Sequence, residues 1–241
     1  MKKQVGHKHL LSQMIAEINN IFAEIGFVFA EGPERELVSL NFDALNFPKD
    51  HPARDMQDTF YIANRSDVVM RTHTSPVQVR YMQTHEVPIR MICPGKVFRN
   101  EATDATHEAQ FFQIEGLMID KDVSLGHLKG VLEYFFSKFF GDEVEVRFRP
   151  SFFPFVEPGI EVDMKIAPNA QNKLSGKWIE IMGAGMVHPN VLRASGINPE
   201  IYQGFAFGCG IDRLAVLKYG IDDIRHLQSG DLRFNSQFKL F

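Results

Sequence analysis

Apolar residues near the amino terminus recur at steps of three and four positions. They are Leu10, Leu11, Met14, Ile15, Ile18, Ile21, Phe22 and Ile25. This spacing places one apolar stripe along a helix, and Gly26 is typical of the position that follows a helix. The apolar run from Phe27 to Phe29 predicts a short strand that stops before the Gly32–Pro33 pair.

Alternation of apolar and polar residues predicts strands through much of the remaining chain. Strands are expected over residues 89–92, 96–99, 111–119, 144–149, 160–166 and 178–182, and at the glycine-rich stretch from residue 204. Helical spacing covers residues 125–139, and Pro76 suits the first turn of a further helix. Because strands and helices do not alternate regularly, the pattern predicts an α+β fold on a mostly antiparallel sheet. Residues 1–241 are expected to form a single domain.

Composition narrows the possible functions. The chain has 241 residues, of which 44% are hydrophobic, enough to fill a substantial core. The net charge of -4 gives no overall basic surface for nucleic acid, so any polyanion must be bound locally. Cys93 and Cys209 lie far apart and are expected to be reduced and buried. Since no apolar run approaches membrane-spanning length, we expect no membrane partner and a cytoplasmic location.

Polar residues of chemical interest concentrate in the stretch FRNEATDATHEAQFFQIEG. Arg99 and Glu101 lie two positions apart, on one face of an expected strand. Gln113 and Glu115 have the same relation on the next strand, and His107 lies between the two strands. A hairpin of these strands would suit a ligand with a phosphate, a ring amine and an ammonium group. The alternative for each pair is an ordinary surface salt bridge.

A second stretch, GFAFGCGIDRL, combines glycines with an arginine near the carboxyl terminus. The spacing of Gly204, Gly208 and Gly210 does not match the GxGxxG pattern of dinucleotide-binding folds. We expect these glycines to let a ligand lie flat against the strand. Arg213 would then reach from the following helix to a phosphate or an aromatic ring. Close strand packing with a surface arginine is the alternative.

These stretches together resemble the class II aminoacyl-tRNA synthetases. EIGFVFAEGPE resembles motif 1, which forms the dimer interface of that class; FRNE with HEAQF resembles motif 2, and GFAFGCGIDRL motif 3. HPARDMQDTFYI, RTHTSPVQVR, RPSFFPFVEPG, GMVHPNVL and YGIDDIRH resemble the catalytic α subunits of bacterial phenylalanyl-tRNA synthetases. The resemblance covers nearly the whole chain in the correct order and implies an antiparallel sheet flanked by helices. The helical arm that contacts tRNA in that family is not expected before GHKHLL.

The resemblance implies an ATP site and a metal. The ATP-binding residues are Arg99, Glu101, His107, Phe111 and Arg213. Arg99 would clamp the α-phosphate, His107 would reach the γ-phosphate and Arg213 would close the other side, which makes these three the catalytic residues. The carboxylate at position 101 would accept from the adenine amine, and the ring at 111 would stack beneath the base. Glu180 would hold Mg²⁺, with an exposed strand carboxylate as the alternative.

The resemblance also implies a site for L-phenylalanine. The ammonium-binding residues are Gln113, Glu115, Ser75 and, through water, His73. The ring-binding residues are Phe153 and Phe155, with Val156 and Ala206 at the far end of the pocket. The aromatic pair would meet the substrate edge to face. Plain core packing is the alternative for the FFPF run.

The implied reaction belongs to protein biosynthesis. Phenylalanine and ATP would give phenylalanyl-adenylate and pyrophosphate, and the amino acid would pass to tRNA(Phe). The implied partner is a large β subunit in an α2β2 heterotetramer, with the helix over residues 10–25 packed across that interface. Two alternatives are a non-catalytic paralogue that binds an amino acid and an enzyme that activates phenylalanine for another carrier. The presence of Arg99, Glu101 and Arg213 favours catalysis.

Overall fold

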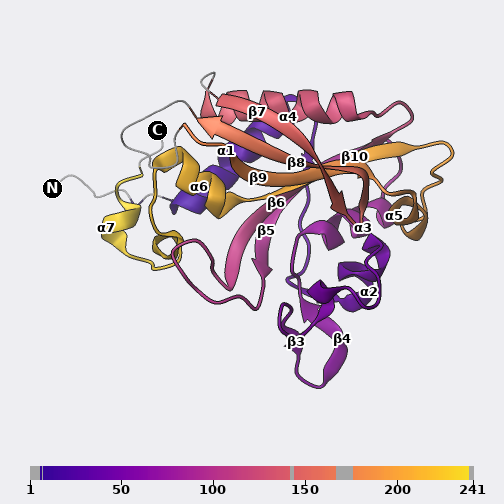
Figure 1. Cartoon of the computed structure of the whole chain (residues 1–241), viewed down its shortest axis with the longest axis horizontal. Coiled ribbons are helices and arrows are strands. Elements are labelled where there is room, and N and C mark those ends of the chain that lie inside the picture. The colour runs from indigo at the N-terminus through magenta and orange to yellow at the C-terminus, as the bar shows by residue number, and fades with distance from the viewer. Residues whose placement is uncertain (1–5, 7, 142–143, 167–175, 239–241) are drawn as a thin grey trace.

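A seven-stranded sheet forms the centre of the computed structural model, which describes residues 6, 8–141, 144–166 and 176–238 (Figure 1). Across the sheet the strands are β1 (Val28–Phe29), β5 (Ile89–Phe98), β6 (Gln110–Asp120), β10 (Gln203–Gly210), β9 (Ile179–Val187), β8 (Val156–Ile166) and β7 (Val144–Phe153). The β1–β5 pair is parallel, and the other pairs are antiparallel. The predicted α+β fold on a mostly antiparallel sheet is therefore confirmed.

Helices cover both faces of this sheet (Figure 1). One face carries α1 (Leu10–Glu24), α4 (Leu125–Phe140) and α6 (Ile211–Tyr219). The other carries α2 (Val38–Asn41), α3 (Ser75–Thr84), α5 (Pro189–Ala194) and a small sheet of β2 (Arg35–Leu37), β4 (Arg65–Met70) and β3 (Tyr61–Ile62). Short helical turns are η1 (Asp43–Leu45), η2 (Pro52–Arg54), η3 (Ile224–Leu227) and α7 (Leu232–Asn235). None of the described helices has the length and apolarity to cross a membrane.

The apolar stripe of α1 packs into the core of its own chain. Met14 and Ile18 are completely buried. The Phe22 ring lies 5.0 Å from the Phe135 ring of α4 and 5.4 Å from the Phe207 ring of β10, in stacked arrangements. The predicted helix is confirmed, but the expectation that this stripe packs across a subunit interface is wrong, because α4, α6 and the sheet already bury it.

Strand β5 is continuous where two separate strands were predicted. It runs through Pro94 and Gly95. Strand β1 ends before Pro94, so β5 is an edge strand there, and sheet edges tolerate proline. A Cβ atom at Gly95 would lie 2.2 Å from Nη2 of the buried Arg71, which explains why the strand has a glycine at this point.

Strand β9 is longer than predicted because glycines continue it. It extends beyond Met182 through Gly183 and Gly185 to Val187. A Cβ atom at Gly185 would lie 2.8 Å from the Val156 Cβ atom, so the neighbouring strand packs directly on the glycine backbone. The strands expected over residues 144–149 and 160–166 and the helix from residue 125 are confirmed as β7, β8 and α4.

Candidate active site

A cavity of about 700 Å³ lies on the sheet face that α3 and α5 cover. Its lining contains the predicted residues His73, Ser75, Arg99, Glu101, His107, Phe111, Gln113, Glu115, Phe153, Phe155, Glu180, Ala206 and Arg213. The fold thus brings motifs from both halves of the sequence to one site. Val156 is the exception, because its buried side chain packs over Gly185 and is not part of the cavity lining.

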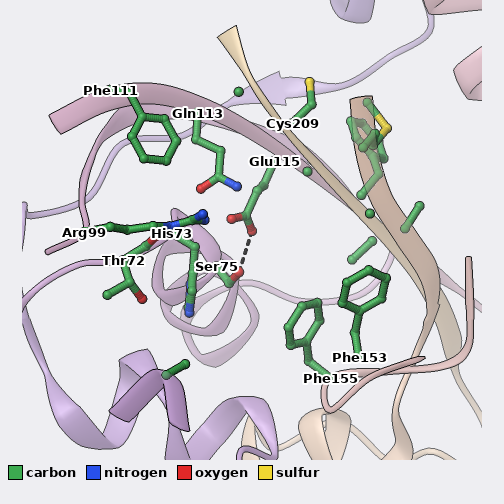
Figure 2. Close-up of a pocket in the computed structure, with 18 of the residues that line it drawn as sticks. Thr72, His73, Ser75, Arg99, Phe111, Gln113, Glu115, Phe153, Phe155 and Cys209 are labelled. Atoms are coloured by element: carbon green, nitrogen blue, oxygen red, sulfur yellow. Dashed lines mark hydrogen bonds between the residues drawn. The ribbon is translucent and has the colours of Figure 1, made fainter. Parts of the chain in front are cut away.

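The β5–β6 hairpin supplies much of the polar wall. Its register places Cys93 opposite Glu115 and Gly95 opposite Gln113, so the predicted hairpin is confirmed. Alternation along β6 directs Phe111, Gln113 and Glu115 into the cavity (Figure 2). The intervening side chains enter the core beneath α1 and α4. The mixture of aromatic and polar side chains along β6 therefore reflects a strand with one face toward the cavity and the other toward the core.

Glu115 is a buried carboxylate that accepts three hydrogen bonds. One oxygen accepts from the Thr74 N–H at 2.9 Å, and the other accepts from Gln78 Nε2 at 2.9 Å and from Ser75 Oγ at 2.5 Å. Figure 2 shows the hydrogen bond from Ser75. Burial raises the pKa of Glu115, while the hydrogen bonds from Ser75 and Thr74 and the positive charge of Arg99 oppose that shift. No ion pair of the described residues includes Glu115. Because a buried charge is costly without a counter-charge, this position favours a cationic ligand group.

The backbone of residues 71–75 holds both ends of the polar wall. The Arg71 carbonyl accepts from the Phe98 N–H at 2.9 Å, and the Thr72 carbonyl accepts from Arg99 Nε at 3.1 Å. The same segment then begins α3 and supplies the Thr74 and Ser75 donors to the buried carboxylate. One short piece of chain therefore locates both the guanidinium and the carboxylate.

The wall between these two charged groups is polar but incompletely satisfied. Burial, with the positive charges of Arg99 and Arg71, lowers the pKa of His73 to about 3, so the imidazole is neutral near pH 7. Oε1 of Gln113 is buried and has no hydrogen-bond partner within the described part of the chain. Since buried acceptors are nearly always paired, a ligand that donates an N–H group would complete this wall.

The loop after β5 differs from the prediction for Glu101. Strand β5 ends at Phe98, so neither Arg99 nor Glu101 lies on the strand, and Glu101 is exposed in the loop that follows. Asn100 explains the turn, because its N–H donates to the Asp58 carbonyl and its side chain donates to the Met56 carbonyl, both at 3.0 Å. Glu101 still lines the cavity, at its exposed side.

His107 lies in the same loop and is held by Asp104. The Asp104 carboxylate accepts from the backbone N–H groups of Thr106 and His107 at 2.7 and 2.8 Å, and it lies 3.1 Å from His107 Nδ1. These hydrogen bonds hold the pKa of Asp104 well below its usual range. The Ala105 carbonyl accepts from the Ile224 N–H at 3.0 Å, which fixes the loop against η3. The histidine is therefore presented to the cavity by an ordered loop.

The opposite rim comes from β9, β10 and α6. Nη1 of Arg213 donates to the Glu180 carbonyl at 2.9 Å, and both side chains are exposed at the cavity. Glu180 offers one carboxylate there, and the described residues contain no cluster of three or more metal-ligating side chains. Between these residues and β6, Gly208 allows close approach, since a Cβ atom would lie 2.7 Å from Glu115 Cγ.

Aromatic rings form the apolar wall facing the polar one (Figure 2). The Phe153 and Phe155 rings are 5.8 Å apart and nearly parallel, and the Phe47 ring lies 5.7 Å from Phe155. Gly183 makes room for this wall, because a Cβ atom there would lie 2.9 Å from Phe153 Cζ. Further apolar residues of the lining include Leu45, Met82, Val187, Val191 and Ala206. One end of the cavity is therefore a slot for an apolar ring.

Sequence reasoning missed several residues of this site. Gln78 lies three positions after Ser75 on α3 and so shares its face, a spacing that could have identified it. Thr72 contributes a backbone carbonyl, which no side-chain pattern announces. Phe47 sits in a loop without periodicity, so its contact with the Phe155 ring had no signal in the sequence.

Comparison with known proteins gives the same assignment as the geometry. The family model for the tRNA synthetases class II core domain (F) matches residues 1–238. The phenylalanine–tRNA ligase α subunit of Bacillus subtilis is 55% identical over 98% of this chain and 70% of that protein. The corresponding subunit of Caldanaerobacter subterraneus is 56% identical over 97% of the chain and 69% of that protein.

A solved structure supports the fold independently of close sequence similarity. The pyrrolysyl-tRNA synthetase of Desulfitobacterium hafniense superposes with a TM-score of 0.72 at 16% identity and covers 99% of this chain and 79% of its own. Identity this low supports the fold alone. Together with the family match and the close relatives, it shows that the chain belongs to the α subunits of phenylalanine–tRNA ligase, within the class II aminoacyl-tRNA synthetases.

Proposed function

We propose that this chain activates L-phenylalanine with ATP and transfers it to tRNA(Phe). The observation that carries the proposal is the combination, in one cavity, of an aromatic slot and a buried carboxylate that forms no ion pair with the described residues. An amino acid with an apolar ring matches both features. ATP as a substrate follows from the class II family.

The amino acid is held at both ends. Its ammonium group donates to Gln113 and Glu115, and Ser75 orders the carboxylate that receives the charge. His73 is neutral and contacts the ammonium group through water. Phe153 and Phe155 contact the substrate ring, and Ala206 contacts its para position. Edge-to-face contacts of this kind contribute about 0.5–1.5 kcal/mol beyond the buried area.

Adenylate formation then depends on positioning and charge. The substrate carboxylate is already ionised and attacks the α-phosphorus of ATP, and the bond to pyrophosphate breaks. Arg99 stabilises the charge that develops on the α-phosphate oxygens. No general base is needed, because the nucleophile carries no proton to remove. In transfer, a hydroxyl of the 3′-terminal ribose of tRNA attacks the acyl carbon of the adenylate, the bond from that carbon to AMP breaks, and the hydroxyl proton passes to the phosphate of the departing AMP.

The remaining nucleotide contacts follow the cavity rim. Phe111 stacks beneath adenine, Glu101 accepts from its amine, and His107 and Arg213 bind the β- and γ-phosphates. The rim carboxylate of Glu180 fits Mg²⁺, which is commonly held by one or two carboxylates together with substrate phosphates. Such an ion supplies charge neutralisation of the leaving pyrophosphate.

A large β subunit is the proposed partner, in an α2β2 heterotetramer located in the cytoplasm. The α subunit name of the relatives supports a partner subunit. With net charge -4, this chain offers little general attraction for a tRNA backbone. The partner therefore supplies most of the tRNA contacts.

The test measures two reactions of the chain with and without the β subunit. ATP–pyrophosphate exchange across a panel of amino acids should depend on phenylalanine, and charging of tRNA(Phe) should rise when the β subunit is added. Absence of exchange from the assembled complex would contradict catalysis and favour the amino-acid-binding paralogue. Exchange without charging, together with loading of another carrier, would favour the alternative acceptor.

A further inference from the structure

Asp212 is a buried acid between the two halves of the proposed nucleotide site. It lies in the first turn of α6, immediately before Arg213, and is 1% exposed. One carboxylate oxygen accepts from the Phe112 N–H at 2.7 Å, and the other accepts from Gln228 Nε2 at 3.3 Å. The acid thus joins the helix that carries Arg213 to the strand that carries Phe111.

The end of β10 explains why β6 needs this acceptor. The pairing of β10 with β6 ends at Gly210 opposite Gln113. Phe112 is therefore the first residue of β6 beyond that ladder, although β5 still pairs with it on the other side through Lys96. A buried N–H group without an acceptor is unfavourable. The Asp212 carboxylate supplies the acceptor that β10 no longer provides at Phe112.

The arrangement keeps a charge buried without a cation. No ion pair of the described residues includes Asp212, and Arg213 directs a guanidinium nitrogen to the Glu180 carbonyl instead. Burial raises the pKa of Asp212 to about 6, and the negative charge of Glu108 acts in the same direction. The side chain of Gln228, which donates to Asp212, is neutral. A neutral acceptor would bridge the two elements at a lower cost of burial, so the charge itself requires an explanation.

We propose that Asp212 is a positioning residue that fixes the spacing between Phe111 on β6 and Arg213 on α6, and so sets the affinity for ATP. The inference rests on the proposed function, in which those two side chains contact the nucleotide. Each is the immediate chain neighbour of one end of the 2.7 Å hydrogen bond. A charge-assisted bond is shorter and more directional than a neutral one, which makes it suited to holding this spacing.

The experiment measures ATP affinity by calorimetry and the KM values for ATP and phenylalanine in pyrophosphate exchange, on the full chain with its β subunit. Asp212→Ala should raise the Kd and KM for ATP about tenfold or more. The KM for phenylalanine should stay within about threefold, because Glu115 and its donors are not attached to Asp212. Asp212→Asn keeps a neutral acceptor in the same place, so it should raise the Kd for ATP less than Asp212→Ala does, to the value that the parent protein reaches below pH 6. Gln228→Ala removes only the 3.3 Å contact and is the matched control.

A pH series provides a readout that a purely structural role would not move. In the parent protein, the Kd for ATP should rise as the pH falls through about 6, because protonation removes the charged acceptor. Glu108, the other ionisable side chains and the γ-phosphate of ATP are the same in both proteins, so a pH effect that is larger in the parent than in Asp212→Asn would assign the difference to Asp212, and equal profiles would contradict the proposal. This comparison also decides the matter if Asp212→Ala does not fold.

Two results would overturn the inference. One is an unchanged ATP affinity in Asp212→Ala, and the other is an equal loss for ATP and phenylalanine together with a lower melting temperature. A parent complex that binds ATP but shows no exchange with phenylalanine would instead contradict the proposed function, and the ATP affinities of the variants would still test Asp212.

Discussion

Replacing Gly208 with alanine should distort the proposed amino-acid site by displacing the Glu115 side chain. Gly208 lies in β10, directly opposite Glu115 of β6 and Gly183 of β9. The added methyl carbon would lie 2.7 Å from Glu115 Cγ and 3.4 Å from Glu115 Cδ. Strand β10 is held on both sides by neighbouring strands and has little freedom to retreat. The Glu115 side chain must therefore move, although three hydrogen bonds hold it in place.

The expected loss of stability has two sources, the overpacking of the interior and the loss of a hydrogen bond to Glu115. Overpacking a filled interior costs about 1–3 kcal/mol. Losing one hydrogen bond to a charged group costs about 1.5–3 kcal/mol. We expect the free energy of unfolding to fall by about 3 kcal/mol, and the Kd for phenylalanine to rise about tenfold or more because its ammonium group loses an aligned carboxylate.

Gly210→Ala is the matched control on the same strand. The nearest atom to a Cβ at Gly210 is the Arg213 Cβ at 3.8 Å, an ordinary contact distance. In this control the free energy of unfolding, measured by urea titration, should change by less than about 1 kcal/mol, and calorimetry should give a nearly unchanged Kd for phenylalanine. Equal losses in the two variants, or a normal phenylalanine affinity in Gly208→Ala, would refute the argument that Gly208 makes room for Glu115.

Three further changes test other parts of the molecule. Arg99→Ala should lower phenylalanine-dependent exchange about a hundredfold or more with a native circular dichroism spectrum; activity within tenfold of the parent would exclude the phosphate role. Ala206→Gly should raise the relative kcat/KM for para-chlorophenylalanine about tenfold, and no change would place Ala206 away from the ring. Arg149 and Arg147 lower the pKa of Asp163 from 3.8 to about 2, so the ionised form adds stability above pH 3.8 that is lost as the pH falls through 2. Asp163→Asn should therefore lower the free energy of unfolding by about 2 kcal/mol at pH 7 and much less near pH 2, as measured by urea titration.

Periodicity predicted the elements well where one face of each is buried. Helix α4 and the β5–β6 hairpin follow directly from apolar spacing, and the hairpin places Gln113 and Glu115 in the cavity. The same reasoning could not identify the partner of α1. An apolar stripe predicts burial, but it does not distinguish burial against the chain's own sheet from burial against another subunit.

Local irregularities account for two other differences. The β7–β8 pairing has a register shift between Ser151 and Phe153, and the β8–β9 pairing has one between Val156 and Gly159. Simple alternation fails there, so the side chain at 156 leaves the cavity wall that its neighbours share. Glu101 lies beyond the strand because Asn100 bonds to a distant loop, a contact that depends on tertiary structure.

The backbone of residues 71–75 sets the geometry of the proposed active site independently of the overall stability of the protein. Arg99 is tied to the Thr72 carbonyl, while Ser75 and the Thr74 N–H are tied to Glu115. The distance between these attachment points is limited by covalent bond lengths and by Pro76, which restricts the conformation of the residue before it. Substitutions elsewhere in the core can therefore lower the melting temperature without altering the spacing between Arg99, the proposed phosphate-binding group, and Glu115, the proposed ammonium-binding group.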